Sequence, residues 1–124
     1  MLSLDPTVYL IASDRSLRAA LLALLDSLPQ RIETIVRSGC GPSIADQETS
    51  RPLAILLDSA GAGDDLQSCI ESLGAIWPGI RILVLADDVE QLKLAVSNGA
   101  ACLLKGSPAT LLLQTLYDVL LIKP

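Results

Sequence analysis

The sequence predicts an α/β protein: one domain, residues 1–124, with a parallel five-stranded sheet covered by helices on both faces. Three observations support this fold class. Short apolar runs alternate with amphipathic segments at helical spacing, which is the order of βα units. The runs LAILL (53–57) and ILVL (82–85) are apolar throughout, as strands buried on both faces should be. A chain of 124 residues is also long enough to bury one core.

Each element follows from a local pattern. Strands are predicted at four uninterrupted apolar runs, 8–11, 53–57, 82–85 and 101–104. A further strand is predicted at 32–36, where Ile32, Ile35 and Val36 are apolar. The first helix has leucines at helical spacing; Ser13 or Asp14 can cap its N-terminus, and Pro29 ends it. Residues 37–52 offer little apolar surface to a core, so we expect a short or irregular second helix there.

The last three helices are framed by residues that start or stop helices. The third helix follows Asp64-Asp65 and stops at Pro78-Gly79. The fourth, about 88–98, follows Asp87-Asp88 and has Gly99 past its end. The last helix is opened by Ser107-Pro108. The two pairs of acids are most simply helix caps, because negative charge is favourable at a helix N-terminus.

Composition narrows the function. The nine basic and fourteen acidic residues give a net charge of −5, without a basic block, so we expect no direct nucleic-acid binding by this chain. The absence of histidine excludes histidine-assisted nucleophiles and histidine metal sites. Mean hydropathy is +0.52, yet no uncharged apolar run approaches the ~18 residues of a membrane helix. The start of the chain, MLSLDP, lacks the basic segment of a signal peptide. We expect a cytoplasmic protein that does not contact membranes.

The three cysteines, Cys40, Cys69 and Cys102, are odd in number and have no spacing typical of metal ligands. We therefore expect buried, reduced thiols rather than a disulfide or a metal site.

Polar residues follow three of the predicted strands: Asp58 the third, Lys105 the fifth, and Ser13-Asp14 the first. The carboxyl ends of parallel strands form the functional edge of such a sheet, so these residues are candidates for one site. Simpler explanations exist for each residue. Asp58 can be a helix cap or loop acid, Lys105 a solvated lysine, and Asp14 is better explained as a helix cap than as a metal ligand.

In element order and spacing, the chain resembles the receiver domains of two-component response regulators of the FixJ/NarL type, over essentially its full length. Three segments carry the resemblance: VYLIASDRSLRAALLALL, LLDSAGAGDDL and NGAACLLKGSPATLL. The last is the most specific, because it is similar to the family's Gly-Ala…Leu-Leu-Lys…Pro segment. The resemblance implies a CheY-like, flavodoxin-type (βα)5 fold with strand order 2-1-3-4-5.

The resemblance also implies roles for individual residues. Asp58 takes the position of the phosphoacceptor, and Lys105 that of the lysine which binds the phosphoryl oxygens. The family's acid pair, which holds Mg²⁺, falls on Ala12 and Ser13, and Asp14 is the only acid nearby. Phosphoryl transfer to a carboxylate needs a bridging cation, and Mg²⁺ prefers carboxylate and water oxygens. We therefore expect no cofactor, and Mg²⁺ at Asp14 and Asp58 only if phosphorylation is retained.

Two further positions depart from the family. The threonine or serine that donates to the phosphoryl group falls on Leu85, and the switch aromatic falls on Cys102. Leucine has no donor, and a hydrogen bond to a charged group is worth roughly 1.5–3 kcal/mol. We interpret the site as degenerate, with phosphorylation weak or absent. We expect Asp58 to pair directly with Lys105 instead.

The leading hypothesis is an atypical receiver that controls a partner or a fused output domain through protein contacts. The alternative is a functional phosphoacceptor that receives phosphate on Asp58 from a histidine kinase and controls a DNA-binding output domain. A third hypothesis is a small-molecule site among Ala12, Leu85 and Cys102. A hydrolase is disfavoured because Ala60 stands where such enzymes carry a second acid.

The last helix carries more apolar residues than one buried stripe requires. One stripe is Leu112, Leu116, Val119 and Ile122; the other is Leu113, Tyr117 and Leu120-Leu121, with Leu111 at its flank. Contiguous exposed apolar surface marks contact sites. The surface formed by Leu113, Tyr117 and Leu121 therefore predicts constitutive association, as a homodimer or with another protein. The alternative is that both stripes are buried by the sheet edge.

Overall fold

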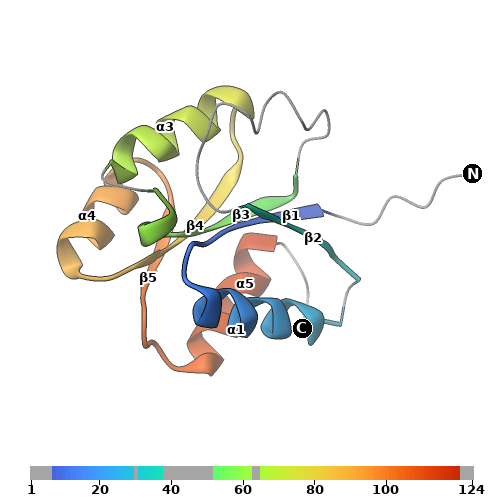
Figure 1. Cartoon of the computed structure of the whole chain (residues 1–124). Coiled ribbons are helices and arrows are strands. Elements are labelled where there is room, and N and C mark those ends of the chain that lie inside the picture. The colour runs from blue at the N-terminus through green and yellow to red at the C-terminus, as the bar shows by residue number, and fades with distance from the viewer. Residues whose placement is uncertain (1–6, 30, 38–51, 63–64, 121–124) are drawn as a thin grey trace, which may run out of the picture.

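The computed structural model describes residues 7–29, 31–37, 52–62 and 65–120 (Figure 1). Strands and helices alternate along most of it. In chain order the elements are β1 (Thr7–Ile11), α1 (Arg15–Asp26), β2 (Glu33–Arg37), β3 (Ala54–Asp58), the short 3₁₀ helix η1 (Ser59–Ala62), α3 (Leu66–Ile76), β4 (Arg81–Ala86), α4 (Val89–Ser97), β5 (Ala101–Leu104) and α5 (Ala109–Leu120). The expected second helix falls outside the described residues, except at the ends of its range.

The five strands form one parallel sheet in the order β2-β1-β3-β4-β5, which confirms the predicted fold class. All five residues of the central strand β3 are buried, which explains why its sequence is apolar until its last residue. In the register between β3 and β4, that residue, Asp58, is paired with Leu85.

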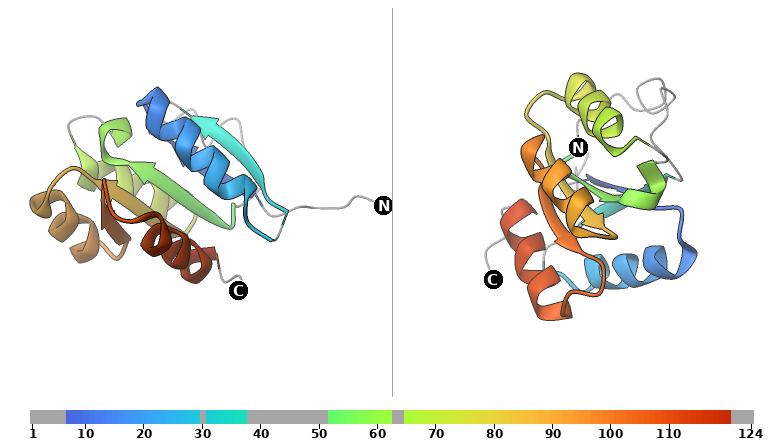
Figure 2. Two further views of the ribbon diagram at one scale, coloured as in Figure 1. Left: turned by 90° about the horizontal axis from the view of Figure 1, so that it is seen from below. Right: turned by 90° about the vertical axis from the view of Figure 1, so that its left-hand side faces the viewer.

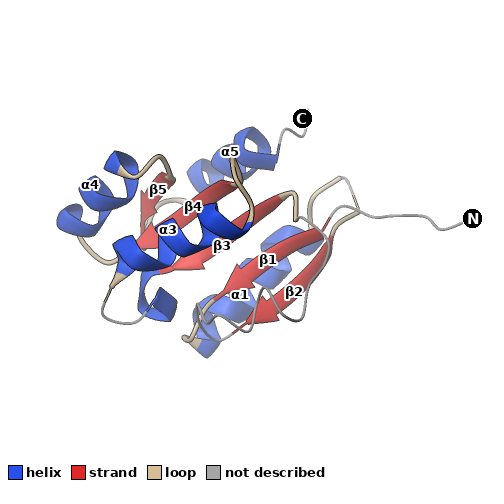
Figure 3. Ribbon diagram, turned by 90° about the horizontal axis from the view of Figure 1, so that it is seen from above, coloured by secondary structure: helices blue, strands red, loops and turns tan. Residues whose placement is uncertain are grey.

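Helices cover both faces of the sheet, and each face has its own core. The helices α1 and α5 lie on one face, and α3 and α4 lie on the other (Figures 1, 2 and 3). Alternate residues of a strand point to opposite faces. Leu83 and Leu85 of β4 therefore join the core under α1 and α5, and Val84 joins the core under α3 and α4.

The helices begin where the sequence predicts. The carboxylates of Asp14, Asp65 and Asp88 accept backbone N–H bonds at the starts of α1, α3 and α4. Gly99 lies past the end of α4 with a φ of +86°, a left-handed conformation that glycine adopts without steric cost. The last helix begins at Ala109, one residue after the proline predicted to open it.

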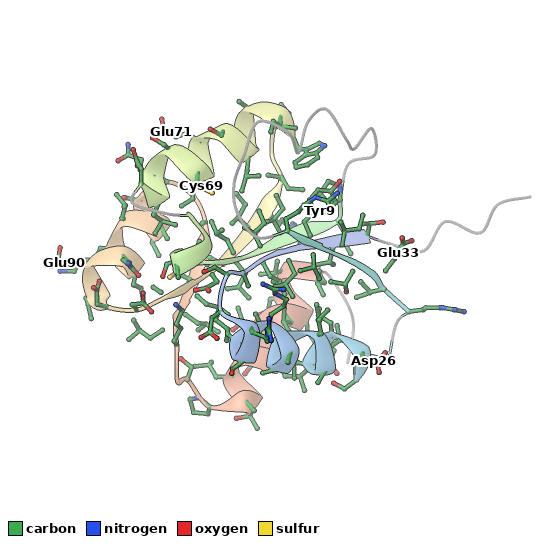
Figure 4. The ribbon with its side chains drawn as sticks, in the orientation of Figure 1. Tyr9, Asp26, Glu33, Cys69, Glu71 and Glu90 are labelled. Atoms are coloured by element: carbon green, nitrogen blue, oxygen red, sulfur yellow. The ribbon has the colours of Figure 1, made fainter. Side chains whose placement is uncertain are left out.

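The expectation of reduced thiols is wrong for Cys69, which is disulfide-bonded. Its side chain lies in the core on the inner side of α3 (Figure 4). Which cysteines meet depends on the packing of segments far apart in the chain, and the cysteine spacing does not encode that. Cys102 is free. Burial raises the pKa of its thiol.

Among the described residues, no helix has the length and apolar character needed to cross a membrane.

Candidate functional site

Asp58 ends β3 at the carboxyl edge of the sheet and is completely buried, at 0% exposure. Ser59 follows it and is also buried. A buried carboxylate is costly unless charges or hydrogen bonds compensate it. The neighbours of Asp58 therefore determine what this edge can do.

Lys105 compensates part of that charge. Its Nζ lies 2.5 Å from Oδ1 of Asp58, and the same oxygen accepts a hydrogen bond of 3.2 Å from the backbone N–H of Ala60. Lys105 directly follows β5, and its own N–H donates to the carbonyl of Ala86 at the end of β4, at 2.8 Å. The predicted contact between Asp58 and Lys105 is confirmed.

The other carboxylate oxygen of Asp58, Oδ2, is buried and has no hydrogen-bond partner within the described part of the chain. An unpaired buried acceptor of this kind loses its hydration without compensation, at a cost of about 1–3 kcal/mol or more for a charged group. The carboxylate is therefore satisfied on one side only.

Asp87 provides a second carboxylate for the same lysine. Its Oδ1 lies 2.7 Å from Lys105 Nζ, and its Oδ2 accepts a hydrogen bond of 3.3 Å from the hydroxyl of Ser59. The expectation that Asp87 and Asp88 both cap α4 is right for Asp88, which accepts from the N–H of Gln91. It is wrong for Asp87, because its side chain turns toward Lys105.

The three charged side chains are arranged from the core outward. Asp58 is fully buried, the side chain of Lys105 is 25% exposed, and that of Asp87 is 52% exposed. The hydrogen bond and charge of Lys105 hold the pKa of Asp87 below its usual 3.8. Burial by itself lowers the pKa of Lys105, but the two carboxylates outweigh burial and raise it above 10.5.

The first strand contributes no carboxylate to this cluster. Ala12 is buried, and the side chain of Asp14 accepts N–H bonds from Ser16 and Leu17, at 2.9 and 3.4 Å, as the cap of α1. Ser13, between them, is exposed. The described residues bring no group of three or more His, Cys, Asp or Glu side chains together as potential metal ligands. Mg²⁺ at Asp14 and Asp58, expected only if phosphorylation is retained, would lack Asp14 as a ligand while that carboxylate caps α1.

Leu85 and Cys102, which the resemblance assigns to the phosphoryl donor and the switch aromatic, lie on opposite faces of the sheet. Leu85 is a core residue under α1 and α5, and Cys102 packs against the core under α3 and α4. A hollow of about 50 Å³ near Leu85 also touches Lys105. Its volume is far below the ~300 Å³ of a typical ligand pocket, which disfavours the small-molecule hypothesis.

On α5, Leu113 and Tyr117 are half-buried and pack against the core under α1 and α5, whereas Leu111 is 43% exposed. Leu120, expected in the outer stripe, is buried. The exposed part of the predicted stripe is thus narrower than its residue types indicate, because the core under α1 and α5 takes up part of it. Leu121, the third residue of the predicted interface, lies outside the described residues.

The sequence pattern contained a signal for Asp87 that the cap interpretation missed. Asp87 directly follows β4, just as Asp58 ends β3 and Lys105 follows β5. The rule that functional residues gather at the carboxyl ends of parallel strands applies equally to all three positions.

No family model and no curated protein matches this sequence, but solved structures do match its fold. A two-component response regulator from Clostridium difficile has a TM-score of 0.77 at 14% identity, covering 95% of this chain and 98% of that one. The phosphorylated cyanobacterial phytochrome response regulator RcpA has a TM-score of 0.76 at 16% identity, covering 96% of each chain. A CheY-like receiver domain protein from Methanospirillum hungatei has a TM-score of 0.76 at 16% identity, covering 94% of each chain.

These matches define the fold class: the chain has the fold of CheY-like response regulator receiver domains. The identities are low, so the likeness concerns the fold, and fold alone does not establish an activity.

Proposed function

We propose that this chain is a receiver-type signalling domain which acts through protein contacts and does not depend on phosphorylation. The observation that supports this most is the state of Lys105. Its ammonium group already contacts two carboxylates, those of Asp58 and Asp87. A lysine in this position is not free to stabilise a phosphoryl group.

The chemistry of phosphoryl transfer supports the same proposal. Catalysis of this reaction depends on positioning and on cations that stabilise developing charge. Asp14 serves as a helix cap, and Ala12 cannot bind a cation. Leu85, in register with Asp58, offers no donor. We therefore expect Asp58 to be a poor phosphoacceptor, and any autophosphorylation or autodephosphorylation to be slow.

The outer surface of α5 is the part of the described chain that we propose for contacts. Leu111 is exposed, and Leu113 and Tyr117 are half-exposed on the same helix. Aromatic and leucine side chains that are only partly covered gain further burial on association. The proposed partner is a second copy of the chain or another protein; the net charge of −5 argues against nucleic acid.

A second candidate function is supported by one specific observation. Oδ2 of Asp58 has no hydrogen-bond partner among the described residues, and an unpaired carboxylate oxygen at this edge is available as a nucleophile. In this alternative, a histidine kinase donates a phosphoryl group to Asp58. Because Asp58 is buried, the loops that cover it would first have to move.

The two candidates differ in their response to a small-molecule phosphodonor. We expect the intact mass of the protein to stay unchanged after incubation with acetyl phosphate and Mg²⁺. A stoichiometric mass increase that is absent in Asp58→Asn would instead support the phosphoacceptor. Sedimentation tests the contact surface separately. We expect association at tens of micromolar that Tyr117→Glu weakens, and a monomer unaffected by that substitution would argue against the α5 surface.

A further inference from the structure

Asp87 reaches Lys105 from a segment that is anchored on both sides. The carbonyl of Ala86, the preceding residue, accepts the N–H of Lys105 at 2.8 Å. The N–H of Asp87 itself donates to Oε1 of Gln91 at 2.7 Å. The backbone at Asp87 is thus tied to β5 and to the first turn of α4, so the carboxylate has a fixed starting point beside the lysine.

The carboxylate of Asp87 uses two groups of the candidate site. One oxygen contacts Lys105 Nζ, and the other accepts the hydroxyl of Ser59. An ammonium group and a hydroxyl are the kind of donors that bind the oxygens of an external anion. Asp87 therefore occupies, from within the chain, donors that an incoming anion at Asp58 would need.

We infer that Asp87 is a tethered, autoinhibitory anion: it neutralises Lys105 and excludes a phosphoryl group or phosphoryl analogue from the edge beside Asp58. Because both carboxylates contact one Nζ atom, their Oδ1 atoms lie within about 5 Å of each other. Two like charges at that separation repel each other, and the ammonium group between them offsets the repulsion. A phosphoryl group on Asp58 would add negative charge and compete with Asp87 for that ammonium group.

The exposure of the two acids determines which one can leave. Asp58 is fully buried, whereas the side chain of Asp87 is 52% exposed. Asp87 can rotate into solvent without unpacking the core, at the loss of a half-exposed ion pair and one long hydrogen bond to Ser59. The carboxylate of Asp87 is thus an inhibitor that can leave the site, and a single neutral substitution of Asp87 should abolish the inhibition.

This inference deepens the proposed function, because it names the residue that keeps the edge closed to phosphate. The test compares the binding of beryllofluoride, a phosphoryl analogue, in the presence of Mg²⁺. Asp87→Asn removes the charge but keeps the size and the ability to accept from Ser59. Asp88→Asn is the matched control, because Asp88 is the neighbouring acid, contacts the N–H of Gln91, and can be replaced by asparagine as a helix cap.

Fluorine NMR of bound beryllofluoride gives the affinity, and the amide signals of Ala60 and Lys105 locate the site. We expect Asp87→Asn to bind at least about tenfold more tightly than the wild type. The reason is that the charge of Asp87 no longer competes with beryllofluoride for Lys105. We expect Asp88→Asn to match the wild type. Equal affinities in the wild type and Asp87→Asn, or no binding by either protein, would overturn the inference.

The same experiment separates this inference from the proposed function. The wild-type titration tests phosphate independence: tight binding by the wild type contradicts the proposed function. The ratio between Asp87→Asn and the wild type tests the tethered anion alone. If neither the wild type nor Asp87→Asn binds beryllofluoride, the proposed function is unaffected and the inference is refuted. If both bind tightly and Asp87→Asn binds tenfold more tightly, the inference is supported and the proposed function is refuted.

Discussion

Replacing Lys105 by methionine removes the ammonium group but keeps a flexible apolar stem of similar length. The substitution leaves the buried carboxylate of Asp58 without its cation, and the N–H of Ala60 is then its only remaining partner among the described residues. Because Oδ2 has no partner in the described part of the chain, the loss of Lys105 leaves a buried charge uncompensated. The native state should therefore lose stability relative to the unfolded chain, in which Asp58 is hydrated.

The size of the effect follows from the burial of the pair. Breaking a fully buried ion pair by removing one partner costs about 3–5 kcal/mol, whereas an exposed pair is worth about 0–1 kcal/mol. Asp58 is 0% exposed and the side chain of Lys105 is 25% exposed, so the pair lies near the buried limit. We expect a loss of about 3 kcal/mol in the free energy of unfolding at neutral pH.

Urea unfolding followed by circular dichroism measures this loss. With a typical urea dependence for a small domain, the midpoint should fall by roughly 1–2 M at an unchanged slope. Lys93→Met is the matched control, because Lys93 is exposed on α4, and it should change stability by less than about 0.5 kcal/mol. Adding Asp58→Asn to Lys105→Met should recover about 2 kcal/mol, since the stranded charge is then gone.

A loss below about 1 kcal/mol for Lys105→Met, the range of a surface pair, would refute this account of the contact. The same holds if the double variant is less stable than Lys105→Met, because the cost would then not arise from the charge of Asp58.

Four further outcomes follow from the contacts. Asp87→Asn should cost less than about 1 kcal/mol at neutral pH, because the acid is half-exposed. Since Lys105 lowers the pKa of Asp87, this contribution is present above pH 3.8 and is lost as the pH falls through the folded-state value. The difference in stability between Asp87→Asn and the wild type, measured by urea unfolding at acidic pH, should therefore approach zero as the pH falls. The pKa of Lys105 is raised above 10.5, so the difference between the wild type and Lys105→Met should persist up to pH 10.5 and shrink at higher pH, as alkaline urea unfolding can check. Asp14→Ala should cost about 1 kcal/mol and Asp14→Ser much less, as for a helix cap; equal losses in thermal unfolding would contradict that role. Leu85→Thr should cost about 2 kcal/mol in urea unfolding, because it removes buried apolar volume and buries a hydroxyl.

The fold could be predicted because its determinants are local. The apolar runs of β3 and β4, the caps at Asp14 and Asp88, and the glycine after α4 each occupy a few adjacent residues. Hydrophobic periodicity and cap chemistry act over the same short range. The contact between Asp58 and Lys105 could be anticipated as well, because parallel strands bring their carboxyl ends to one edge.

The errors concern features that depend on tertiary packing. Residue type does not separate Asp87 from the cap that follows it; its place directly after β4 is a signal, and the contact with Lys105 establishes its role. Leu120 is buried because it packs into the core under α1 and α5, which the helical pattern alone does not indicate. The disulfide at Cys69 likewise depends on which segments approach each other in space, which cysteine spacing does not record.

The amide NMR spectrum of the wild-type protein, recorded with and without beryllofluoride and Mg²⁺, is the most direct test of phosphate independence. We expect an almost unchanged spectrum, because Lys105 is held by Asp58 and Asp87. Saturable shifts at Asp58 and Lys105 that extend into α5 would contradict it, and would identify the chain as a phosphate-responsive receiver.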